Sequence, residues 1–470
     1  METIDLLHSG QLLGIKRLDL AAGLTEFPIE IFDLADSLEI LNLSDNHLRS
    51  LPADLGRLNQ LKIIFLSNNN FEEVPEVLAD CPNLLMVGFK SNKIRVLGEN
   101  SLPPNVRWLI LTDNQLERLP DSIGQLHQLQ KLMLAGNQLR SLPDEMAACQ
   151  NLELVRLAAN QLESLPSWLF NLPRLSWLAY AGNPCCIANL LPTVPSISWA
   201  DLTLTDTLGE GASGIILKGV WQSPAQPPTD VAIKIFKGAM TSDGMPADEM
   251  NACLAAGGHP HLVGAVGKIS DCPNNRAGLI LSLISADYQN LGNPPSLDSC
   301  TRDTYPAGTS FTMAAILQIA IGISSAAAYL HTQGIMHGDL YAHNILVDGA
   351  THHPLLGDFG AASSYDLNDR IAGAALERLE VRAFGCLLED LLNHCEFPDR
   401  EANMSTLAAD PVRVRKASAV PTAEPLRQQL DKLTQACLQP IPASRPLFGE
   451  ICETLALMLE CFNSIDCVVG

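Results

Sequence analysis

The segment LNLSDNHLRSLP at residues 41–52 decides the fold of the first half of the chain, because its pattern recurs along the sequence. Spaced leucines precede one asparagine, and a Leu-Pro pair closes the unit. All intervals between units are 23 residues except one of 22. Eight units at nearly one period predict a stacked repeat array. The asparagine position is held by Gly23 in a degenerate first unit and then by Asn46, Asn69, Asn92, Asn114, Asn137, Asn160 and Asn183.

Each unit is expected to contain one short strand whose alternate leucines point inward, such as Leu132 and Leu134. The asparagine can bind backbone groups left unpaired where the chain leaves the strand. One unit cannot bury its own apolar face, so the units must stack to be stable. We expect residues 1–14 and 184–198 to cap the two ends.

This pattern resembles the leucine-rich-repeat family over residues 15–183. The resemblance implies an α/β solenoid, which we assign to residues 1–198, and a role in protein binding without chemistry of its own. The alternative is that the array is only a spacer. Positions beside the inward leucines face the concave side, and an apolar patch there predicts a partner surface. The patch comprises Ile63, Phe65, Met86, Trp108, Ile110 and Met133. The alternative for the patch is packing beneath another part of the same chain.

The second half carries a glycine-rich segment at Gly209, Gly211 and Gly214. A dinucleotide-binding turn would be followed at once by a helix, but the β-rich residues 215–221 follow instead. The glycines therefore belong to a strand–turn–strand hairpin. Such a loop can lie against phosphate groups, because no Cβ atom blocks the approach to its backbone.

Polar residues at fixed spacing follow this hairpin. Lys234 ends the apolar strand 231–234, and Glu249 lies in an expected helix over 247–256. Asp339 and Asn344 are separated by five positions, and Asp358 precedes Phe359-Gly360. Phosphoryl transfer requires such a set, namely a carboxylate that orients a hydroxyl and oxygen ligands for a divalent cation.

Residues 201–470 are on this basis similar to an α+β bilobal protein kinase domain of eukaryotic type, in the tyrosine-kinase-like group. The resemblance implies ATP and Mg²⁺ as cofactors, with Mn²⁺ as an alternative. It implies that Gly209, Gly211 and Gly214 cover the phosphates and that Leu283 lies in the hinge that accepts adenine. The remaining implied roles are Lys234 and Glu249 as the phosphate-binding pair, Asp339 as the base, and Asn344 and Asp358 as metal ligands.

Several positions depart from that family. Gly338 replaces the arginine that usually precedes the base, and Tyr341 and His343 stand where a basic helper residue is usual. Glu380 replaces an aspartate at the start of the next expected helix. No Ala-Pro-Glu sequence is present, and we predict that Glu377 pairs with Arg445 instead. We interpret residues 290–310 as a surface insertion.

Three functions fit these residues. The leading prediction is a protein kinase that phosphorylates Ser or Thr on partners chosen by the repeats. The alternatives are a pseudokinase scaffold, in which the repeats carry the function, and a kinase for a small molecule. The net charge of −22 argues against nucleic acid or an anionic membrane as the main partner.

Composition also indicates the compartment. The 13 cysteines show no repeated spacing, and the adjacent pair Cys185-Cys186 is expected to be reduced. The N-terminus has no signal-peptide pattern, and the apolar residues 313–330 are interpreted as a core helix rather than a membrane span. We therefore expect a cytoplasmic protein.

The apolar concave patch leads to a test. If it binds a partner, Trp108→Ala combined with Phe65→Ala should abolish partner or substrate capture, because aromatic anchors dominate interfaces. Phosphorylation of a generic acceptor should be unchanged. Co-precipitation and a kinase assay measure the two effects, and a severe loss of thermal stability would instead identify the patch as internal packing.

Overall fold

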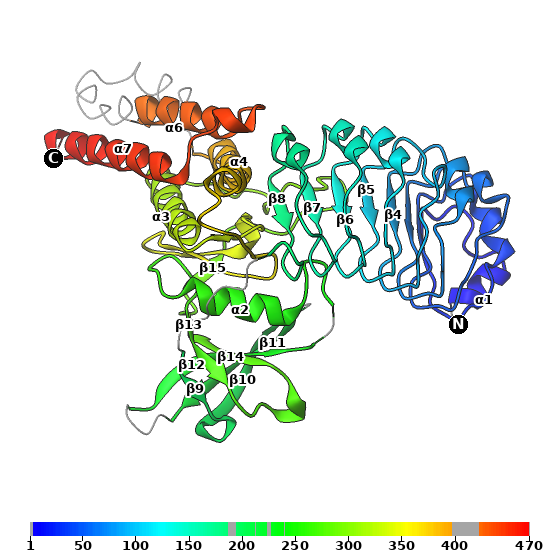
Figure 1. The fold of residues 1–470 in the computed structure, drawn as a ribbon, viewed down its shortest axis with the longest axis horizontal. Helices are drawn as coiled ribbons and strands as arrows, with labels where there is room; N and C mark the ends of the chain where they lie inside the picture. Colours follow the sequence, from blue (N-terminus) through cyan, green and yellow to red (C-terminus); the bar gives the residue numbers. More distant parts are fainter. Residues whose placement is uncertain are drawn as a thin grey trace, which may run out of the picture.

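The computed structural model describes residues 3–186, 194–211, 213–222, 227–238, 240–396 and 423–469. Figure 1 shows a curved repeat array whose C-terminal end lies against a second domain, while its N-terminal end extends away. The elements of the array are α1 (Thr3–His8), β1 (Arg17–Asp19), η1 (Ile29–Leu34), β2 (Ile40–Asn42), η2 (Leu55–Arg57), β3 (Ile63–Phe65), η3 (Glu76–Asp80), β4 (Met86–Gly88), β5 (Trp108–Ile110), η4 (Asp121–Gln125), β6 (Lys131–Met133), η5 (Asp144–Ala148), β7 (Leu154–Arg156), η6 (Ser167–Asn171) and β8 (Trp177–Ala179).

The second domain begins with a sheet and ends with helices. Its elements are β9 (Ser196–Ile197), η7 (Trp199–Asp201), β10 (Leu202–Glu210), β11 (Gly214–Trp221), β12 (Thr229–Phe236), α2 (Pro246–Ala256), β13 (Ala265–Ile269), η8 (Pro273–Asn275), β14 (Gly278–Ser282), β15 (Tyr288–Asn290), α3 (Met313–Thr332), β16 (Ile335–Met336), η9 (Ala342–Asn344), β17 (Ile345–Asp348), β18 (Pro354–Leu356), β19 (Ser363–Ser364), α4 (Arg370–Asn393), α6 (Ala423–Cys437), η11 (Pro442–Ser444) and α7 (Phe448–Val469).

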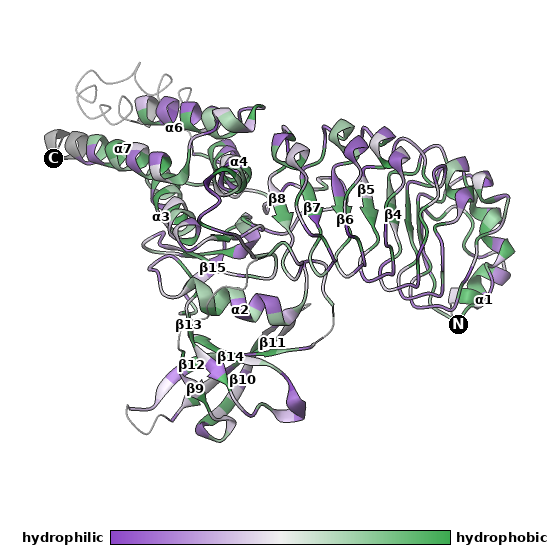
Figure 2. Ribbon diagram, in the orientation of Figure 1, coloured by the Kyte–Doolittle hydropathy of each residue, from purple (hydrophilic) through white to green (hydrophobic). Residues whose placement is uncertain are grey.

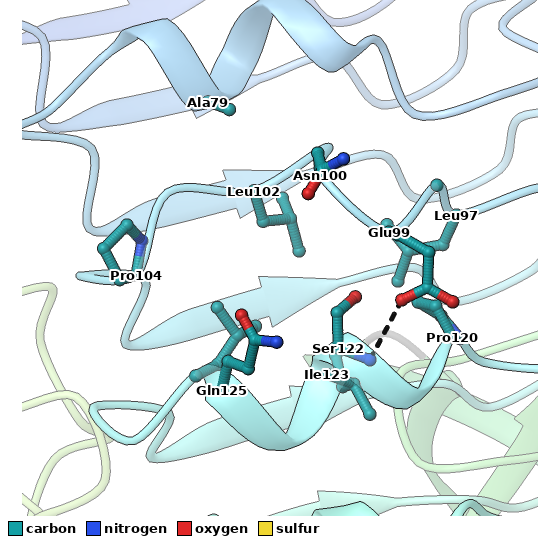
Figure 3. A pocket seen from close by; sticks show the side chains of 12 residues that line it. Ala79, Leu97, Glu99, Asn100, Leu102, Pro104, Pro120, Ser122, Ile123 and Gln125 are labelled. Carbon is teal, nitrogen blue, oxygen red and sulfur yellow. Dashed lines mark hydrogen bonds between the residues drawn. The ribbon is translucent and has the colours of Figure 1, made fainter.

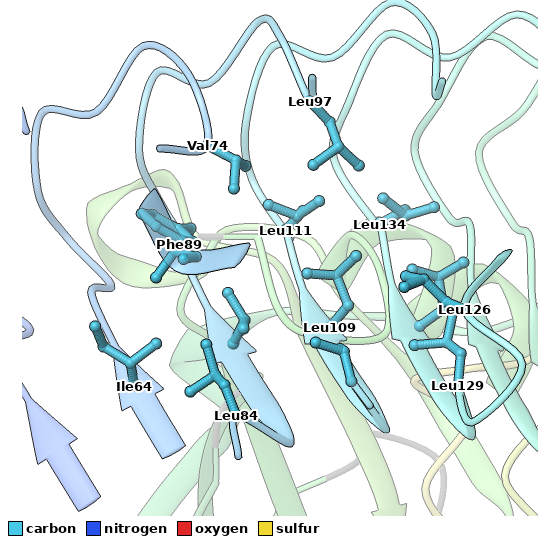
Figure 4. Close-up of a cluster of buried hydrophobic side chains, with 14 of the residues drawn as sticks. Ile64, Val74, Leu84, Phe89, Leu97, Leu109, Leu111, Leu126, Leu129 and Leu134 are labelled. Atoms are coloured by element: carbon cyan, nitrogen blue, oxygen red, sulfur yellow. The ribbon is translucent and has the colours of Figure 1, made fainter. Parts of the chain in front are cut away.

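The eight strands of the array form one parallel sheet in sequence order. Leucine, isoleucine, valine and phenylalanine side chains from successive units stack in rows behind the sheet, as Figure 4 shows for the central units. The array is thus an α/β leucine-rich-repeat solenoid, as predicted, although the helical segments on its convex side are mostly single 3₁₀ turns.

The repeated asparagines satisfy buried backbone groups. In one unit the Asn137 amide nitrogen donates to the carbonyl oxygens of Leu111 and Leu134, each at 2.9 Å. Its side-chain oxygen accepts from the backbone N–H of Leu116 at 3.0 Å. One side chain therefore links adjacent units, which explains why this residue type recurs at the point where the chain leaves each strand.

The 22-residue interval has a structural consequence. Between η3 and η4 the chain forms no 3₁₀ helix over its described residues, and a cavity of about 260 Å³ remains on the convex side. Leu97, Leu102, Pro104 and Ile123 line it, and Figure 3 shows them around the opening. The Glu99 carboxylate accepts from the backbone N–H of Ser122 at 3.1 Å and ties this short unit to the next.

The second domain has two lobes. A six-stranded sheet of order β10-β11-β12-β14-β13-β9 forms the first lobe together with α2, and α3, α4, α6 and α7 form most of the second. β9 pairs in parallel with β13, so residues 196 and 197 join this sheet. The predicted repeat domain of 1–198 therefore overlaps the second domain at its end.

The apolar segment 313–330 lies in α3. Among the described helices, α3 is the one long and apolar enough to span a membrane, but 67% of its most apolar window is buried inside the domain. The Thr312 side chain caps its N-terminus by accepting from the Ala315 N–H at 3.2 Å. The segment packs as a core helix, as expected.

The C-terminal repeats pack against the second domain. Met133, Leu154 and Trp177 belong to one buried cluster with residues of the second domain, and Trp108 and Ile110 pack partly against it. Figure 2 colours β8, the strand next to the second domain, as hydrophobic. Burial of these side chains is favourable by roughly 25 cal/mol per Å² of apolar area removed from water.

This packing corrects the predicted partner surface. Met133 is only 7% exposed within the interdomain cluster, so its prediction as a free partner residue was wrong, and the alternative of internal packing holds for it. Ile63 and Met86 lie outside this cluster but are also buried, at 9% and 4% exposed, so the prediction was wrong for them as well. Phe65, Trp108 and Ile110 are half-buried. The accessible part of the patch is therefore limited to Phe65, Trp108 and Ile110.

Two further expectations were wrong. Glu377 accepts from the backbone N–H of Phe448 at 2.7 Å and does not pair with Arg445. Arg445 instead donates to the carbonyl oxygens of Gln439, Arg378 and, at 2.7 Å, Pro173 of the array. Residues 290–310 are no plain surface insertion, since Cys300 and Thr301 are buried and Thr301 contacts Glu153 of the array.

The asparagine ladder generates a prediction. Asn137→Ala should lower the free energy of unfolding by about 2 kcal/mol or more, because several buried backbone groups lose their partners. Denaturation followed by circular dichroism measures this loss. Asn83→Ala is the matched control, since Asn83 is exposed and makes a single hydrogen bond to Asn59. Equal effects of the two substitutions would contradict the assigned role.

Candidate functional site

A cavity of about 550 Å³ lies between the two lobes of the second domain. β12 contributes Lys234 and α2 contributes Glu249. Because side chains alternate along β12, Ala232 and Lys234 share the cavity face while Ile233 is buried on the opposite face. Other lining residues include Leu208, Ile216, Cys253, Val263, Leu279, Leu281, Ser282, Leu283, His343, Asn344, Leu346, Gly357, Asp358 and Phe359.

Lys234 and Glu249 form an ion pair at the cavity, as the kinase resemblance implied. The side chains are only 13% and 6% exposed, so their charges are screened little by water. α2 is set by local signals, with Pro246 in its first turn and Gly257 at its C-cap with φ of 66°. These signals set where the helix begins and ends, and Glu249 lies in its first turn.

The three glycines of the hairpin have different roles. A Cβ atom added at Gly209 or Gly211 would meet no neighbour, so these two residues leave the backbone open. Gly214 instead lies in β11, where a Cβ atom would sit 2.6 Å from the carbonyl oxygen of Ile235. The geometry suits Gly209 and Gly211 for phosphate contact and gives Gly214 a packing role between β11 and β12.

The segment 337–344 is held by one buried carboxylate. Glu380 of α4 is fully buried, and its oxygens accept from the backbone N–H groups of Gly338 at 2.7 Å and His337 at 3.2 Å. The His331 ring lies 2.9 Å from the same carboxylate. Burial opposes ionisation of Glu380, but these donors outweigh it and lower its pKa. The helix begins at Arg370, ten residues before the expected start.

Asp339, Asn344 and Asp358 meet beside this segment. The Asn344 amide nitrogen donates to the Asp339 carboxylate at 2.7 Å and to its backbone carbonyl at 2.9 Å. The His337 ring lies 2.9 Å from the Gly357 carbonyl oxygen and accepts from the Asp339 N–H at 3.3 Å. These bonds join the segment carrying Asp339 to the one carrying Asp358.

Asn344 and Asp358 fit a hard divalent cation. The amide nitrogen of Asn344 is turned to Asp339, so its oxygen is available, and both residues line the cavity. Asp358 has φ of 56°, and one carboxylate oxygen accepts from the Gly360 N–H at 3.1 Å, while the other has no hydrogen bond from the described part of the chain. Oxygen donors of this kind suit Mg²⁺, which takes few protein ligands and completes its shell with phosphate and water.

Family profiles match both parts of the chain. A profile described as protein tyrosine and serine/threonine kinase matches residues 202–382. A leucine-rich-repeat profile matches residues 36–94, 104–162 and 127–184. The chain carries leucine-rich repeats followed by a protein kinase domain.

Several similar curated proteins have names that describe them as protein kinases. Probable serine/threonine-protein kinase gdt4 of Dictyostelium discoideum is 25% identical over 288 residues, which cover 56% of this chain and 16% of that protein. The Abl tyrosine-protein kinase transforming protein of Abelson murine leukemia virus is 28% identical over 285 residues, covering 55% and 35%. Probable inactive serine/threonine-protein kinase roco10 of D. discoideum is 36% identical over 128 residues, covering 25% and 5%. The chain spans well under half the length of these relatives.

Sequence reasoning missed one support of the kinase segment 337–344. Asp303, in the supposed surface insertion, accepts from the backbone N–H groups of Ala342 at 2.6 Å and His343 at 3.3 Å. It also lies 2.7 Å from the His343 ring nitrogen. Burial lowers the pKa of His343, but Asp303 outweighs burial, and the net shift is upward. No sequence signal marked Asp303, because its partner segment lies about forty positions away.

The second missed group is a basic side chain from the array. Arg156 of β7 forms ion pairs with Asp339 and with Asp243, which lies in the loop before α2. Burial raises the pKa of the Asp339 carboxyl above its ordinary value, and the charge of Arg156 opposes that shift. The alternation of side chains along β7 places Arg156 on the concave side, but only the docked domains reveal its partners.

The segment after Asp358 is covered by the array. Ser363 is 1% exposed, and its hydroxyl accepts from the Tyr180 N–H at 2.9 Å. The Tyr365 hydroxyl lies 2.8 Å from the His331 ring. Both hydroxyl groups are engaged inside the protein, and Gly338 offers no guanidinium for a phosphate added here.

Kinase activity should therefore not depend on phosphorylation of Ser363, Ser364 or Tyr365. Phosphatase treatment is expected to leave the turnover number within about twofold of the untreated value, since Gly338 supplies no guanidinium and Arg156 is already paired with Asp339 and Asp243. Ser363→Asp should lower activity and thermal stability, because it buries a charge, whereas Ser296→Asp at an exposed site should change neither. A large loss after phosphatase treatment that Ser363→Asp restores would contradict this expectation.

Proposed function

We propose that this protein is an ATP-dependent protein kinase that phosphorylates serine or threonine, with repeats that recruit a protein partner. The observation that carries the proposal is the convergence of Lys234, Glu249, Asn344 and Asp358 on one cavity, with Asp339 bonded to Asn344. These side chains come from four separate segments of the sequence. Their convergence supports a common reaction centre.

The roles follow from their chemistry. ATP would supply the transferable phosphoryl group, held with Mg²⁺ or Mn²⁺. Lys234, fixed by Glu249, places a positive charge where phosphate oxygens can bind. Asn344 and Asp358 offer oxygen ligands for the cation, and Leu283 lies on the cavity wall where adenine would bind. Asp339 orients the acceptor hydroxyl and takes up its proton.

The Ser/Thr assignment is proposed from the names of six similar curated proteins. Five bear serine/threonine-protein kinase names, one of them as inactive, and one bears a tyrosine-protein kinase name. The segment 337–344 contains neither a lysine nor an arginine at the positions that usually separate the two classes. A peptide library with Ser, Thr and Tyr acceptors would measure this preference.

The partner is proposed to bind the concave face over β2 to β4. The half-buried Phe65 lies there, outside the cluster that packs against the kinase domain, and the buried Ile63 and Met86 pack beside it on β3 and β4. Solenoid concave faces offer extended surfaces for protein binding. We also propose a cytoplasmic location, which is supported by the free thiols of the cysteines whose side chains the structure describes.

Asp339→Asn provides the central test of phosphotransfer. It should lower the turnover number by at least about 100-fold, because the residue acts as base and orienter, while nucleotide affinity stays near that of the wild type. Asp358→Asn should also weaken binding of the metal–nucleotide complex. Labelled ATP measures transfer, and calorimetry measures binding.

Asp298→Asn is the matched control, since Asp298 is an exposed aspartate of the same domain. It should leave both transfer and binding unchanged. Unchanged turnover in the Asp339→Asn variant would refute the assigned base. A wild-type protein that binds nucleotide without transferring phosphate would instead support the pseudokinase alternative, and transfer only to an added metabolite would support a small-molecule kinase.

A further inference from the structure

The kinase segment that carries Asp339 lacks a basic helper residue of its own. Residues 337–344 contain no lysine or arginine, and Tyr341 and His343 hold the two positions where one was expected. The His343 ring is directed to Asp303, at 2.7 Å. The nearest guanidinium is supplied by another domain.

Arg156 of β7, in the repeat array, supplies this guanidinium. Its Nη2 atom pairs with one carboxylate oxygen of Asp339, while Asn344 donates to the other at 2.7 Å. Its Nη1 atom donates to the Gly338 carbonyl oxygen at 3.0 Å, and its Nε atom donates to Asp243 at 2.6 Å. The Arg156 side chain is 3% exposed. Asp339 is therefore fixed from both sides, by one donor from each domain.

The unusual residues of the kinase segment match this docking. Gly338 has φ of +73°, and a Cβ atom there would lie 2.5 Å from the carbonyl oxygen of Leu178 in β8. It would also lie 2.7 Å from the carbonyl oxygen of Ala361 in the kinase domain, so a side chain here would collide with both domains. Tyr341 stacks on Trp177 with ring centroids 4.3 Å apart and planes 7° apart. Trp177 also donates its indole N–H to the Leu340 carbonyl oxygen at 3.1 Å.

The energetics favour an array that stays docked on the kinase domain over one that dissociates from it. A buried guanidinium is tolerated only when its charge and donors are satisfied, and Arg156 has two carboxylates and a carbonyl oxygen. Separation would leave Asp339 and Asp243 without this shared cation. It would also expose Leu154 and Trp177, which belong to a cluster with residues of the kinase domain.

We propose that Arg156 is a positioning residue of the phosphotransfer site, supplied by the repeat array, which orients Asp339 together with Asn344. The reaction centre then spans both domains, and the array has a second role besides partner recruitment. This inference rests on the proposed kinase activity. The opposite role, in which the array obstructs the acceptor and inhibits transfer, predicts mutational effects of opposite sign.

The test compares variants of the full chain. Arg156→Ala should lower the turnover number about 10- to 100-fold, since small misplacements of reacting groups have effects of that size. The Michaelis constant for ATP and the nucleotide affinity should stay within about twofold, because Arg156 does not line the cavity. Millimolar guanidinium chloride should restore part of the activity of Arg156→Ala, and an equal concentration of sodium chloride should not.

Two further variants and a control keep the test decisive if Arg156→Ala fails to fold. Arg156→Lys retains a cation and should remain more active than Arg156→Gln, which is neutral and retains donors only on a shorter side chain. Trp177→Phe keeps the ring stack but loses the bond to Leu340, and should lower turnover modestly. Arg140→Ala is the matched control, because Arg140 is an exposed arginine of the array, and it should behave as the wild type.

The outcomes separate the inference from the proposed function. Wild-type or higher turnover in Arg156→Ala, or equal turnover in Arg156→Lys and Arg156→Gln, would overturn the positioning role. Higher turnover in Trp177→Phe would indicate an obstructing array and would also overturn it. A wild-type protein that binds ATP but transfers no phosphate would refute the proposed function itself, and the positioning role with it.

Discussion

The burial of one guanidinium between two carboxylates is the constraint on which the arrangement of the two domains depends. Arg156 is nearly inaccessible to water, and its partners Asp243 and Asp339 both belong to the kinase domain. A charge placed there requires its counter-charges in fixed positions. The contact also has an apolar part, in which Trp177 stacks on Tyr341. Polar and apolar contacts together define one docking geometry.

The kinase segment at the centre of this contact is braced from three directions. Glu380 holds its backbone from α4, Asp303 holds it from the segment before α3, and Arg156 holds Asp339 from the array. Two of these supports are carboxylates that accept backbone N–H groups, which gives strong and directional bonds. Such bracing limits the motion of Asp339 and suits a reaction that depends mainly on placement of its groups.

The array divides into two regions with different surroundings. Its C-terminal strands contribute side chains to the core cluster of the kinase domain, while β2 to β4 lie farther along the solenoid. The stacking that stabilises each unit also makes the array stiff, because every unit contacts its neighbours along its whole length. A partner bound near the N-terminal end would therefore be held at a defined place relative to the kinase cavity.

The sequence by itself determined the two folds and most of the candidate site. A strict period fixes a solenoid, because each unit needs its neighbours to bury its leucines. The sequence predicted Lys234, Glu249, Asn344 and Asp358 as site residues, and the structure brings all four to one cavity. Their spacing could be recognised because it reflects local elements such as β12 and α2. Gly214 stays a predicted phosphate contact, and the structure adds a packing role from the close approach of β12, which no local pattern records.

Only the tertiary structure decided how the domains meet. Three contacts join residues that are far apart in the sequence, in segments with no shared pattern. The separations are 183 positions for Arg156 and Asp339, 40 for Asp303 and His343, and 164 for Trp177 and Tyr341. The same absence of a local signal explains why Met133 was placed on a free surface and Glu377 was paired with Arg445. Periodicity reports the face on which a side chain lies, whereas its partner depends on which distant surface covers that face.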